Sequence, residues 1–232
     1  MRRLHICIVV TLLGCVVPSF AQEYLYELTL IGSFTTSSKL FRHPDDADEI
    51  IRSQFLRLDN IFGAGIDLRR TIEPLAVQIG LSVEYLSKTE LFDTSGSRTI
   101  PVKDGYTTIP IELSGYFFIP IGDENIRFYM GGGGGTYLGS RRYEYAGARA
   151  RTIERIMGYG IHVLSGLLYK VSPRISLRSE IKFRDVQFET VNKFTQQVIV
   201  YRGTPLYLDQ EPFASRINID GMALTVGIAV HF

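Results

Sequence analysis

The stretch Gly221-Met-Ala-Leu-Thr-Val-Gly-Ile-Ala-Val-His-Phe232, at the end of the sequence, decides the fold. Its large apolar residues occupy every second position, and small or weakly polar residues occupy the positions between them. Because successive side chains of a β-strand point to opposite faces, the pattern predicts a strand with one fully apolar face. A tilted strand of about 9–11 residues crosses the hydrocarbon of a bilayer, so this stretch is long enough to span a membrane.

Seven earlier segments show the same alternation, which is typical of an all-β protein. They are Tyr24–Ser33, Ile61–Arg69, Leu75–Ser87, Tyr106–Phe118, Ile126–Tyr137, Ile156–Tyr169 and Ile175–Phe188. With the last stretch they predict eight strands of similar character.

The links between these segments alternate in length. The long links are 34–60, 88–105, 138–155 and 189–220, and the short links are 70–74, 119–125 and 170–174. Outer-membrane barrels have long extracellular loops and short periplasmic turns, whereas a soluble sandwich has no reason to alternate in this way. The sequence therefore predicts an all-β, eight-stranded antiparallel up-and-down transmembrane β-barrel with short periplasmic turns and long extracellular loops.

Aromatic residues fall near the ends of the predicted strands, where a barrel meets the two membrane interfaces. The chain has no tryptophan, so tyrosine and phenylalanine must form both girdles. The predicted periplasmic girdle comprises Tyr24, Tyr26, Phe117, Phe128, Tyr169 and Phe232, and the outer girdle comprises Phe62, Tyr85, Tyr159 and Phe183.

Two of the long links carry patterns of their own. Pro44, the acidic residues after it, and the apolar Ile50, Ile51 and Phe55 predict a short amphipathic helix. The apolar run that begins at Gln197 predicts a hairpin above the membrane.

The N-terminus has the pattern of a secretory signal peptide. A basic start precedes a mostly apolar run, and small residues lead up to Ala21. We expect residues 1–21 to be this signal and residues 22–232 to form the barrel domain, located in the bacterial outer membrane. Cys15, in a Leu-Leu-Gly-Cys sequence, leaves lipidation as an alternative to cleavage after Ala21.

Charge and cysteine content exclude several classes of function. Loss of the signal would remove both cysteines and two of the 25 basic residues, leaving 23 against 24 acidic residues. This balance gives no electrostatic reason to expect nucleic acid as a partner. A chain without cysteine has no disulfide framework and no thiol chemistry.

The strand face opposite the apolar one carries charges of both signs. We assign to it an ion-pair network of Glu27, Asp67, Arg69, Glu84, Glu112, Arg127, Arg178, Glu180, Lys182 and Arg184. An eight-stranded barrel is just wide enough for side chains to fill its interior, and buried charges are costly unless they pair. The pattern therefore predicts a plugged, ion-paired lumen. Because parity alone does not say which face is inner, a soluble lipocalin-like carrier with an apolar interior stays open as an alternative.

No arrangement of residues in the sequence indicates catalysis, a cofactor or a metal. The glycine run Gly131–Gly135 is followed by neither Gly-Lys-Ser/Thr nor a helical pattern, so it predicts close backbone approach in a strand. No histidine pair has metal-ligand spacing, and His162 and Ser165 fall on opposite faces of one strand. We expect no catalytic residue, no cofactor and no bound metal.

Two segments carry a resemblance to a known family. Thr107-Thr-Ile-Pro-Ile-Glu-Leu113, followed by Arg127-Phe-Tyr-Met-Gly-Gly-Gly-Gly-Gly135, is similar to the fourth and fifth strands of the small outer-membrane β-barrel family that includes the OmpA barrel domain and OmpX. The last strand, which ends in phenylalanine, resembles theirs too. The resemblance implies passage through periplasmic chaperones and insertion by the barrel-assembly machinery. The assembly signal that we assign on this basis comprises Tyr24, Val226, Ile228, Val230 and Phe232.

The leading functional hypothesis is a non-enzymatic integral outer-membrane barrel that presents extracellular loops for surface interaction or envelope integrity. Loops on a rigid scaffold are where such functions usually reside. The expected partners are outer-membrane lipid and an extracellular ligand bound through the loops. The alternatives are a narrow, porin-like channel and a lipid-modifying outer-membrane enzyme.

Overall fold

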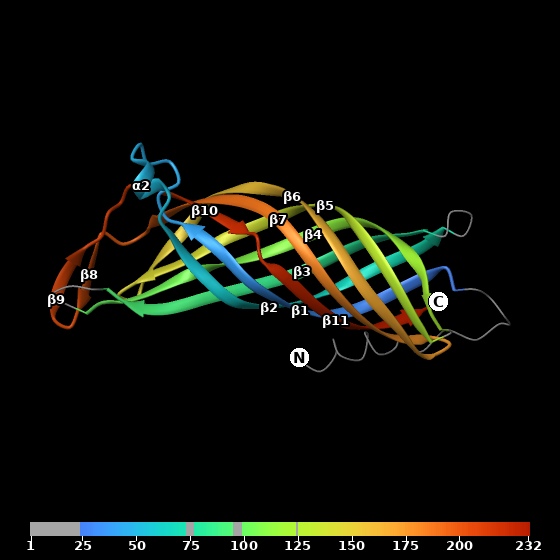
Figure 1. The fold of residues 1–232 in the computed structure, drawn as a ribbon. Helices are drawn as coiled ribbons and strands as arrows, with labels where there is room; N and C mark the ends of the chain where they lie inside the picture. Colours follow the sequence, from blue (N-terminus) through green and yellow to red (C-terminus); the bar gives the residue numbers. More distant parts are fainter. Residues whose placement is uncertain (1–23, 73–76, 95–98, 124) are drawn as a thin grey trace.

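The computed structural model describes residues 24–72, 77–94, 99–123 and 125–232. The predicted signal peptide, with Cys15, and the short turn at Pro74 lie outside these residues. Nearly all of the described chain is β-strand (Figure 1). Within these ranges, no helix is both long and apolar enough to pass through a bilayer.

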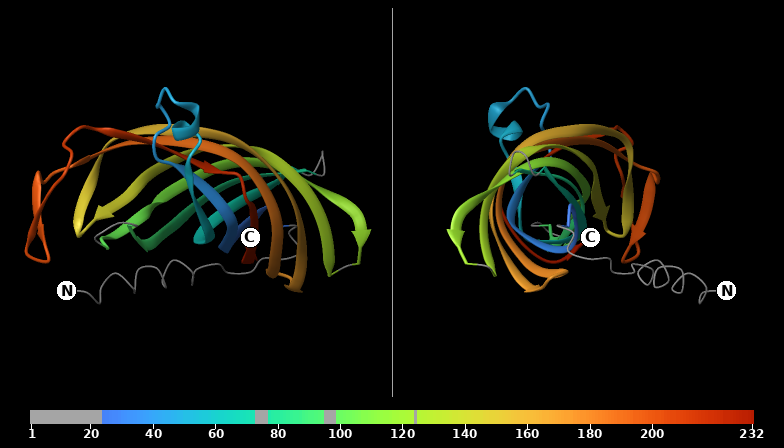
Figure 2. Two further views of the ribbon diagram at one scale, coloured as in Figure 1. Left: turned by 60° about the vertical axis from the view of Figure 1, so that its left-hand side comes forward. Right: turned by 90° about the vertical axis from the view of Figure 1, so that its right-hand side faces the viewer.

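Eight antiparallel barrel strands close into a ring, which confirms the predicted fold class. Seven of them are β1 (Tyr26–Phe41), β2 (Phe55–Ile72), β3 (Val77–Asp93), β4 (Pro101–Gly122), β5 (Ile126–Tyr145), β6 (Ala148–Ser172) and β7 (Ile175–Phe194). The eighth consists of β10 (Phe213–Ile219) continued by β11 (Met222–His231). Each barrel strand pairs with the next, and β1 closes the ring by pairing with the eighth strand as well as with β2. The right-hand view of Figure 2 shows the strands curving around a common axis.

The strands are longer than the sequence alternation predicted, and the predicted bounds of the long links are wrong. The link 138–155 is mostly strand, with only the turn Ala146-Gly147 between β5 and β6. Beyond the membrane the outward positions face water, and apolar residues such as Val186 and Phe188 face inward instead. The apolar residues therefore change from the outward to the inward face within one strand. A strand predicted from uninterrupted alternation consequently ends before the real strand does.

Both short elements predicted in the long links are present. Helix α2 (Glu49–Arg52) begins after Asp48, whose Oδ1 accepts a hydrogen bond of 2.8 Å from the Ile50 N–H. Strands β8 (Val198–Tyr201) and β9 (Thr204–Tyr207) form a separate hairpin. Figure 1 shows α2 and the hairpin at the end of the barrel opposite the C-terminus.

β1 and β2 change phase near the extracellular end of the barrel. The pairing of the two strands skips Asn60, which has a φ of 56°. Thr35 and Ser38 are both buried, so the inward side of β1 passes from odd to even positions. Because a shift of one residue exchanges the two faces of a strand, Leu40 and Leu58 lie inside the barrel.

A band of exposed apolar side chains encircles the barrel. Leu30, Ile161 and Val226 are exposed to 66%, 71% and 64%. The exposed aromatic residues that border the band are Tyr26, Phe117, Phe128, Tyr169 and Phe232 on the periplasmic side, and Phe62, Tyr85, Tyr159 and Phe183 on the outer side. Tyr24, which precedes β1, is half-buried. An apolar exterior around charged interior groups is the reverse of a lipocalin and excludes the soluble carrier.

The interior contains apolar clusters as well as charges. The largest, which we name the apolar layer, consists of Leu40, Leu58, Ile61, Leu86, Tyr106, Tyr137, Val186, Phe188, Ile217 and Ile219. A second cluster towards the periplasmic end consists of Tyr116, Tyr129, Leu164 and Leu168. A third, in the extracellular extension, consists of Ala148, Ala150, Phe194 and Leu208.

Candidate functional site: the barrel interior and the outer rim

The inward face of β7 shows how the interior is layered along the barrel axis. From the periplasmic end, its buried residues are Ser176, Arg178, Glu180, Lys182, Arg184, Val186, Phe188, Thr190, Asn192 and Phe194. The charged residues therefore occupy the level of the lipid-facing band, and the apolar layer lies above them. Beyond the apolar layer the interior becomes polar again.

The lower charged cluster holds two arginines and three carboxylates. Arg69 contacts Asp67 at 2.8 Å and also pairs with Glu180. Arg178 contacts Asp67 at 2.5 Å and also pairs with Glu27. All five side chains are buried. Asp67 therefore joins the two guanidinium groups, and the five residues form one connected cluster.

Neutral groups complete the lower cluster. The Tyr129 hydroxyl donates a hydrogen bond of 2.6 Å to Glu180, and the Thr225 hydroxyl donates one of 3.3 Å to the other oxygen of the same carboxylate. The Arg69 guanidinium carbon lies 3.6 Å from the centre of the Tyr116 ring, a cation–π geometry. These contacts connect the charges to the apolar cluster at the periplasmic end.

The upper charged cluster holds two cations and two carboxylates. Lys182 Nζ lies 2.7 Å from Glu112 and 3.5 Å from Glu84. Arg184 Nε lies 3.0 Å from Glu112, and the same guanidinium pairs with Glu84. The Tyr137 hydroxyl donates a hydrogen bond to Glu112, which joins this cluster to the apolar layer above it. Each charge therefore faces two groups of opposite sign.

Glycines leave room for the long charged side chains. A Cβ on Gly65 would lie 2.9 Å from the Cγ of Glu84, and a Cβ on Gly135 would lie 2.8 Å from the Cγ of Glu112. Within the five-glycine run, a Cβ on Gly133 would lie 1.9 Å from the carbonyl oxygen of Leu113. The run therefore marks close backbone approach, as the sequence predicts.

Nine of the ten charges that the sequence assigned to the network lie in these two clusters, and Arg127 does not. Arg127 is exposed near the periplasmic start of β5, with its guanidinium carbon 5.8 Å from the centre of the Phe118 ring. Parity identifies the face on which a residue lies but not its height along the barrel axis. The assignment of Arg127 to the network is therefore corrected.

The sequence did not indicate a third buried ion pair, above the apolar layer. Arg141 donates hydrogen bonds of 2.8 and 2.7 Å to the two carboxylate oxygens of Asp104 and one of 2.6 Å to Ser215. Arg42 Nε lies 3.3 Å from the same carboxylate. These residues were missed because 88–105 and 138–155 were interpreted as links, and only strand pairing brings Asp104 and Arg141 together.

A buried serine and histidine also meet across strands, a pair that periodicity did not identify. Ser114 Oγ and His162 Nε2 share a hydrogen bond of 2.8 Å, and His162 Nδ1 lies 4.0 Å from Glu112. The longer distance exceeds hydrogen-bond range, and His162 is 3% exposed. Among the described residues, no group of three or more His, Cys, Asp or Glu side chains is arranged to hold a metal ion.

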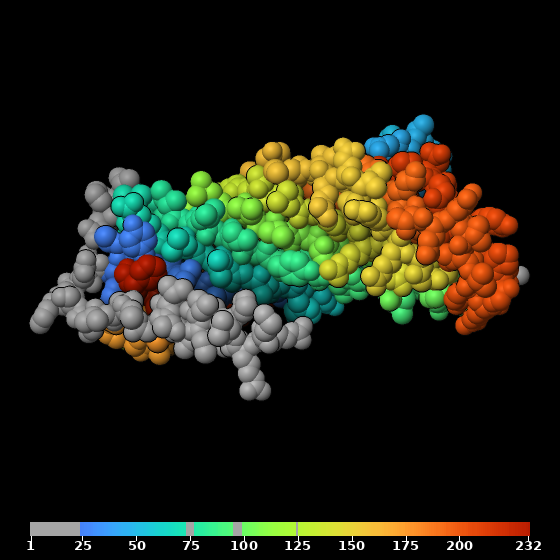
Figure 3. Space-filling view, turned by 180° about the vertical axis from the view of Figure 1, so that it is seen from behind, coloured from blue at the N-terminus to red at the C-terminus, as the bar shows by residue number. Residues whose placement is uncertain are grey.

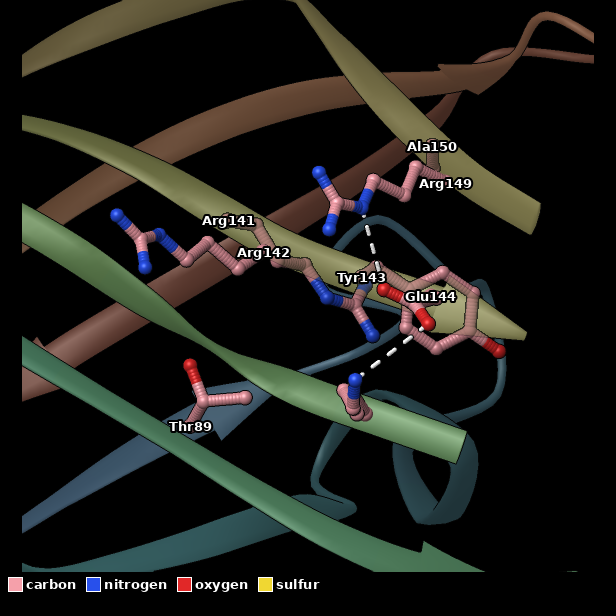
Figure 4. Close-up of a pocket in the computed structure, with 8 residues that line it drawn as sticks. Thr89, Arg141, Arg142, Tyr143, Glu144, Arg149 and Ala150 are labelled. Carbon is pink, nitrogen blue, oxygen red and sulfur yellow. Dashed lines mark hydrogen bonds and ion pairs between the residues drawn. The ribbon is translucent and has the colours of Figure 1, made fainter. Parts of the chain in front are cut away.

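A hollow of about 520 Å³ lies at the extracellular rim, lined by Thr89, Lys103, Arg141, Arg142, Tyr143, Glu144, Arg149 and Ala150. Glu144 pairs with Arg149 at 3.2 Å and with Lys103 at 3.6 Å (Figure 4). Burial raises the pKa of the Tyr143 hydroxyl, so this group stays neutral at physiological pH. The lining is predominantly cationic.

The members of the assigned assembly signal lie at the closure of the barrel. Val226, Ile228, Val230 and Phe232 are on the lipid face, with Phe232 exposed to 49%. The Phe232 ring stacks on Tyr26 with ring centres 5.8 Å apart. Tyr24 lies apart from this row, and its hydroxyl accepts a hydrogen bond of 3.0 Å from Arg174.

Comparison with known proteins identifies the fold. No protein-family model matches the sequence, and no curated protein is similar to it in sequence. The outer membrane protein OprG from Pseudomonas aeruginosa has a similar structure, with a TM-score of 0.54 and 11% identity over 90% of this chain and 97% of that one. Neisserial surface protein A has a TM-score of 0.45 and 12% identity over 89% of this chain and 97% of its own. Ail of Yersinia pestis has a TM-score of 0.44 and 11% identity over 90% of this chain and 100% of its own.

The fold is therefore that of the small outer-membrane β-barrel proteins. The exposed apolar band and its aromatic borders independently require a lipid environment, because an apolar surface of this extent is not stable in water. The chain is an outer-membrane protein.

Proposed function

We propose that this protein is a non-enzymatic outer-membrane barrel with a closed, ion-paired bore, which presents its extracellular end for surface interaction or envelope integrity. The observation that carries the proposal is the content of the bore. Nine charged side chains are buried there in two paired clusters, and ten apolar-layer residues lie directly above them.

A permeation path would have to cross both layers. An eight-stranded barrel leaves space only for side chains, and here these side chains are large and hydrogen-bonded to one another. Removing one partner from a buried ion pair typically costs about 3–5 kcal/mol, so thermal opening of either cluster is rare. The apolar layer offers a passing ion only the hydroxyls of Tyr106 and Tyr137, and the Tyr137 hydroxyl is already bonded to Glu112.

Catalysis is not supported by the geometry. Ser114 and His162 are buried beneath the apolar layer, where a substrate has no route to the hydroxyl. A catalytic triad would need a carboxylate to orient His162. The nearest one, Glu112, is already paired with Lys182 and Arg184 and lies too far from His162 to do so. A nucleophile needs an accessible reacting centre as well as a base.

The extracellular end is suited to contact with other molecules. Ile50 on α2 is exposed to 72%, Val200 on β8 to 74% and Tyr207 on β9 to 79%. Helix α2 and the hairpin of β8 and β9 lie at the end of the barrel opposite the C-terminus, beyond the lipid-facing band (Figure 1). Exposed apolar groups in water often mark interaction sites, and here a rigid barrel supports them.

Planar-bilayer recording on the purified mature protein tests the closed bore. The wild type is expected to give no stable conductance. The matched control is Glu84→Ala/Arg184→Ala/Phe188→Ala, which removes one ion pair without leaving a net charge and hollows the apolar layer. This variant is expected to conduct. Reproducible single-channel steps from the wild type would refute the closed bore and favour the narrow channel.

Adhesion of bacteria to immobilised fibronectin, laminin and collagen tests the surface role. The Leu208 N–H donates a hydrogen bond of 2.8 Å to the Gln197 carbonyl at the base of the hairpin, so a two-residue turn can replace 198–207 without disturbing the barrel. Adhesion is expected to fall while heat-modifiable gel migration stays normal. The control replaces the two-residue periplasmic turn Pro173-Arg174 by the same two residues, and an equal loss of adhesion in both variants would count against the proposal.

A further inference from the structure

The hairpin of β8 and β9 carries an exposed face that is wholly apolar. The side chains that share this face, in two directly opposed pairs, are Val198 with Tyr207 and Val200 with Pro205. Val198 is exposed to 45%, Val200 to 74% and Tyr207 to 79%. The opposite face of the hairpin is not free, because Ile199 packs against the third apolar cluster. A contiguous apolar surface in water indicates an interface with another molecule.

The hairpin holds this face in a fixed shape. Its turn consists of Arg202 and Gly203, whose φ values are 49° and 78°. Two consecutive residues with positive φ form the tight turn whose twist suits a pair of antiparallel strands. At the base of the hairpin, the Leu208 N–H donates a hydrogen bond of 2.8 Å to the Gln197 carbonyl. A partner therefore meets a preformed surface, and little conformational entropy is lost on binding.

The charges of the segment 195–212, which joins β7 to β10, are separated along the hairpin. Arg202 lies in the turn, and the other two charged residues, Asp209 and Glu211, lie at the base. The Asp209 Oδ1 accepts a hydrogen bond of 2.9 Å from the Glu211 N–H. All three side chains are exposed, and none of them forms a salt bridge within the described part of the chain. At about 3.4 Å per residue, the turn and the base are roughly 20 Å apart. The hairpin is therefore positive at one end, negative at the other and apolar between them.

This distribution is complementary to itself. When a second hairpin packs on the apolar face with its strands antiparallel to the first, the turn of each copy lies at the base of the other. Arg202 of each copy then meets Asp209 and Glu211 of the other, and the apolar side chains of the two copies cover one another. Such a contact has two-fold symmetry and uses the same surface on both copies. The parallel arrangement would place Arg202 against Arg202, so the charges select the antiparallel one.

The orientation of the hairpin favours this contact between neighbours in one membrane. Figures 1 and 2 show β8 and β9 running across the long axis of the barrel. Two copies in one membrane have parallel barrel axes, and a two-fold rotation about that direction reverses any strand that runs across it. The two hairpins are therefore antiparallel without any change in their shape. Figure 3 shows the hairpin, in orange, projecting at one end of the molecule, where a neighbour can reach it.

We propose that the apolar face of the β8–β9 hairpin is the contact surface between two copies of this chain in the outer membrane. Four apolar side chains per copy make a small interface, so the contact lies at the weak end of specific association. Confinement of both copies to one membrane raises their effective concentration and offsets this weakness. The inference rests on the proposed function only in that the extracellular end is an interaction surface, for which it names the partner.

Cross-linking in isolated outer membranes tests the pair, and the expected mature chain has no cysteine of its own. Val200→Cys places a thiol on the apolar face, and Ile50→Cys on α2 is the matched control, because the two side chains are exposed to 74% and 72%. Membranes with equal amounts of each variant are treated with a short bis-maleimide, and the covalent dimer is measured on gels. Val200→Cys is expected to give at least about tenfold more dimer than Ile50→Cys.

Charge reversal distinguishes a specific pair from random collision. In the Val200→Cys chain, either Arg202→Glu or Asp209→Arg/Glu211→Arg is expected to lower the amount of dimer about tenfold, because like charges then meet at both ends of the interface. The three substitutions together bring opposite charges into contact again, and the amount of dimer is expected to return to within about twofold of the starting value. All three residues are exposed, and heat-modifiable migration verifies that each variant is folded.

Two results would overturn the proposal. One is an equal amount of dimer from Val200→Cys and Ile50→Cys. The other is a combined charge variant that forms no more dimer than the two partial variants. The adhesion assay is independent of both measurements. Loss of adhesion on replacement of 198–207, without a dimer, would keep the proposed function and assign the hairpin to a foreign protein. A specific dimer with undiminished adhesion would keep the pair and count against the surface role.

Discussion

Removal of Arg184 tests whether the buried charges stabilise the barrel as a set. Arg184 is fully buried and contacts both Glu84 and Glu112. In Arg184→Met, a side chain of similar length but no charge, Lys182 alone faces two carboxylates. One negative charge is then buried without compensation, and the expected loss in the free energy of unfolding is about 3–5 kcal/mol.

A second substitution distinguishes lost pairing from lost packing. In Arg184→Met/Glu84→Gln the excess carboxylate is removed, and Glu112 keeps its contact of 2.7 Å with Lys182. The double variant is expected to recover about 2 kcal/mol relative to the single variant, although it carries more substitutions. A packing defect would persist in the double variant, because the methionine is present in both.

The assay follows from the composition of the chain. It contains no tryptophan, so intrinsic tryptophan fluorescence cannot report unfolding. The folded fraction in urea is instead measured as the heat-modifiable band on unheated gels, after incubation in lipid vesicles. A loss below about 1 kcal/mol in Arg184→Met would refute the reasoning. So would a double variant less stable than the single one.

Three further predictions concern packing and assembly. Phe188→Ala is expected to cost about 3–5 kcal/mol of the free energy of unfolding, because it empties the centre of the apolar layer; a loss under 1 kcal/mol in the same urea titration would contradict this. Gly133→Ala is expected to prevent closure of the barrel, since its Cβ would meet the Leu113 carbonyl at 1.9 Å, whereas Gly115→Ala, with no atom within 4 Å, should fold normally; unheated gels of refolded protein compare the two. Phe232→Ala is expected to reduce the amount of folded protein in outer membranes while leaving the stability of refolded protein within about 1 kcal/mol; equal losses in both measurements would show a purely structural role.

The charged network was predictable residue by residue because it depends on period-two parity. In a barrel with lipid outside, each residue of the network must face inward, and alternation alone states which residues do so. Arg127 was misassigned because its height depends on where β5 begins relative to the membrane. Asp104 and Arg141 were missed because the segments 88–105 and 138–155 were interpreted as links. The Ser114–His162 pair was missed because alternation gives the face of each residue, whereas only the register of the strands shows which inward residues meet.

The sequence by itself determined the class of fold, the number of barrel strands, the two faces of each strand and nearly all of the charges inside. Each of these follows from local alternation, because a membrane imposes one environment along the whole outer surface. Only the tertiary structure decided which face meets lipid, the apolar layer above the charges, the length of the strands beyond the membrane and the buried pair of Asp104 and Arg141. The physical reason is that water surrounds the extracellular part of the barrel, so the apolar residues of the strands point inward in that part. Which charged residues pair depends on which strand lies alongside, and local sequence does not state this.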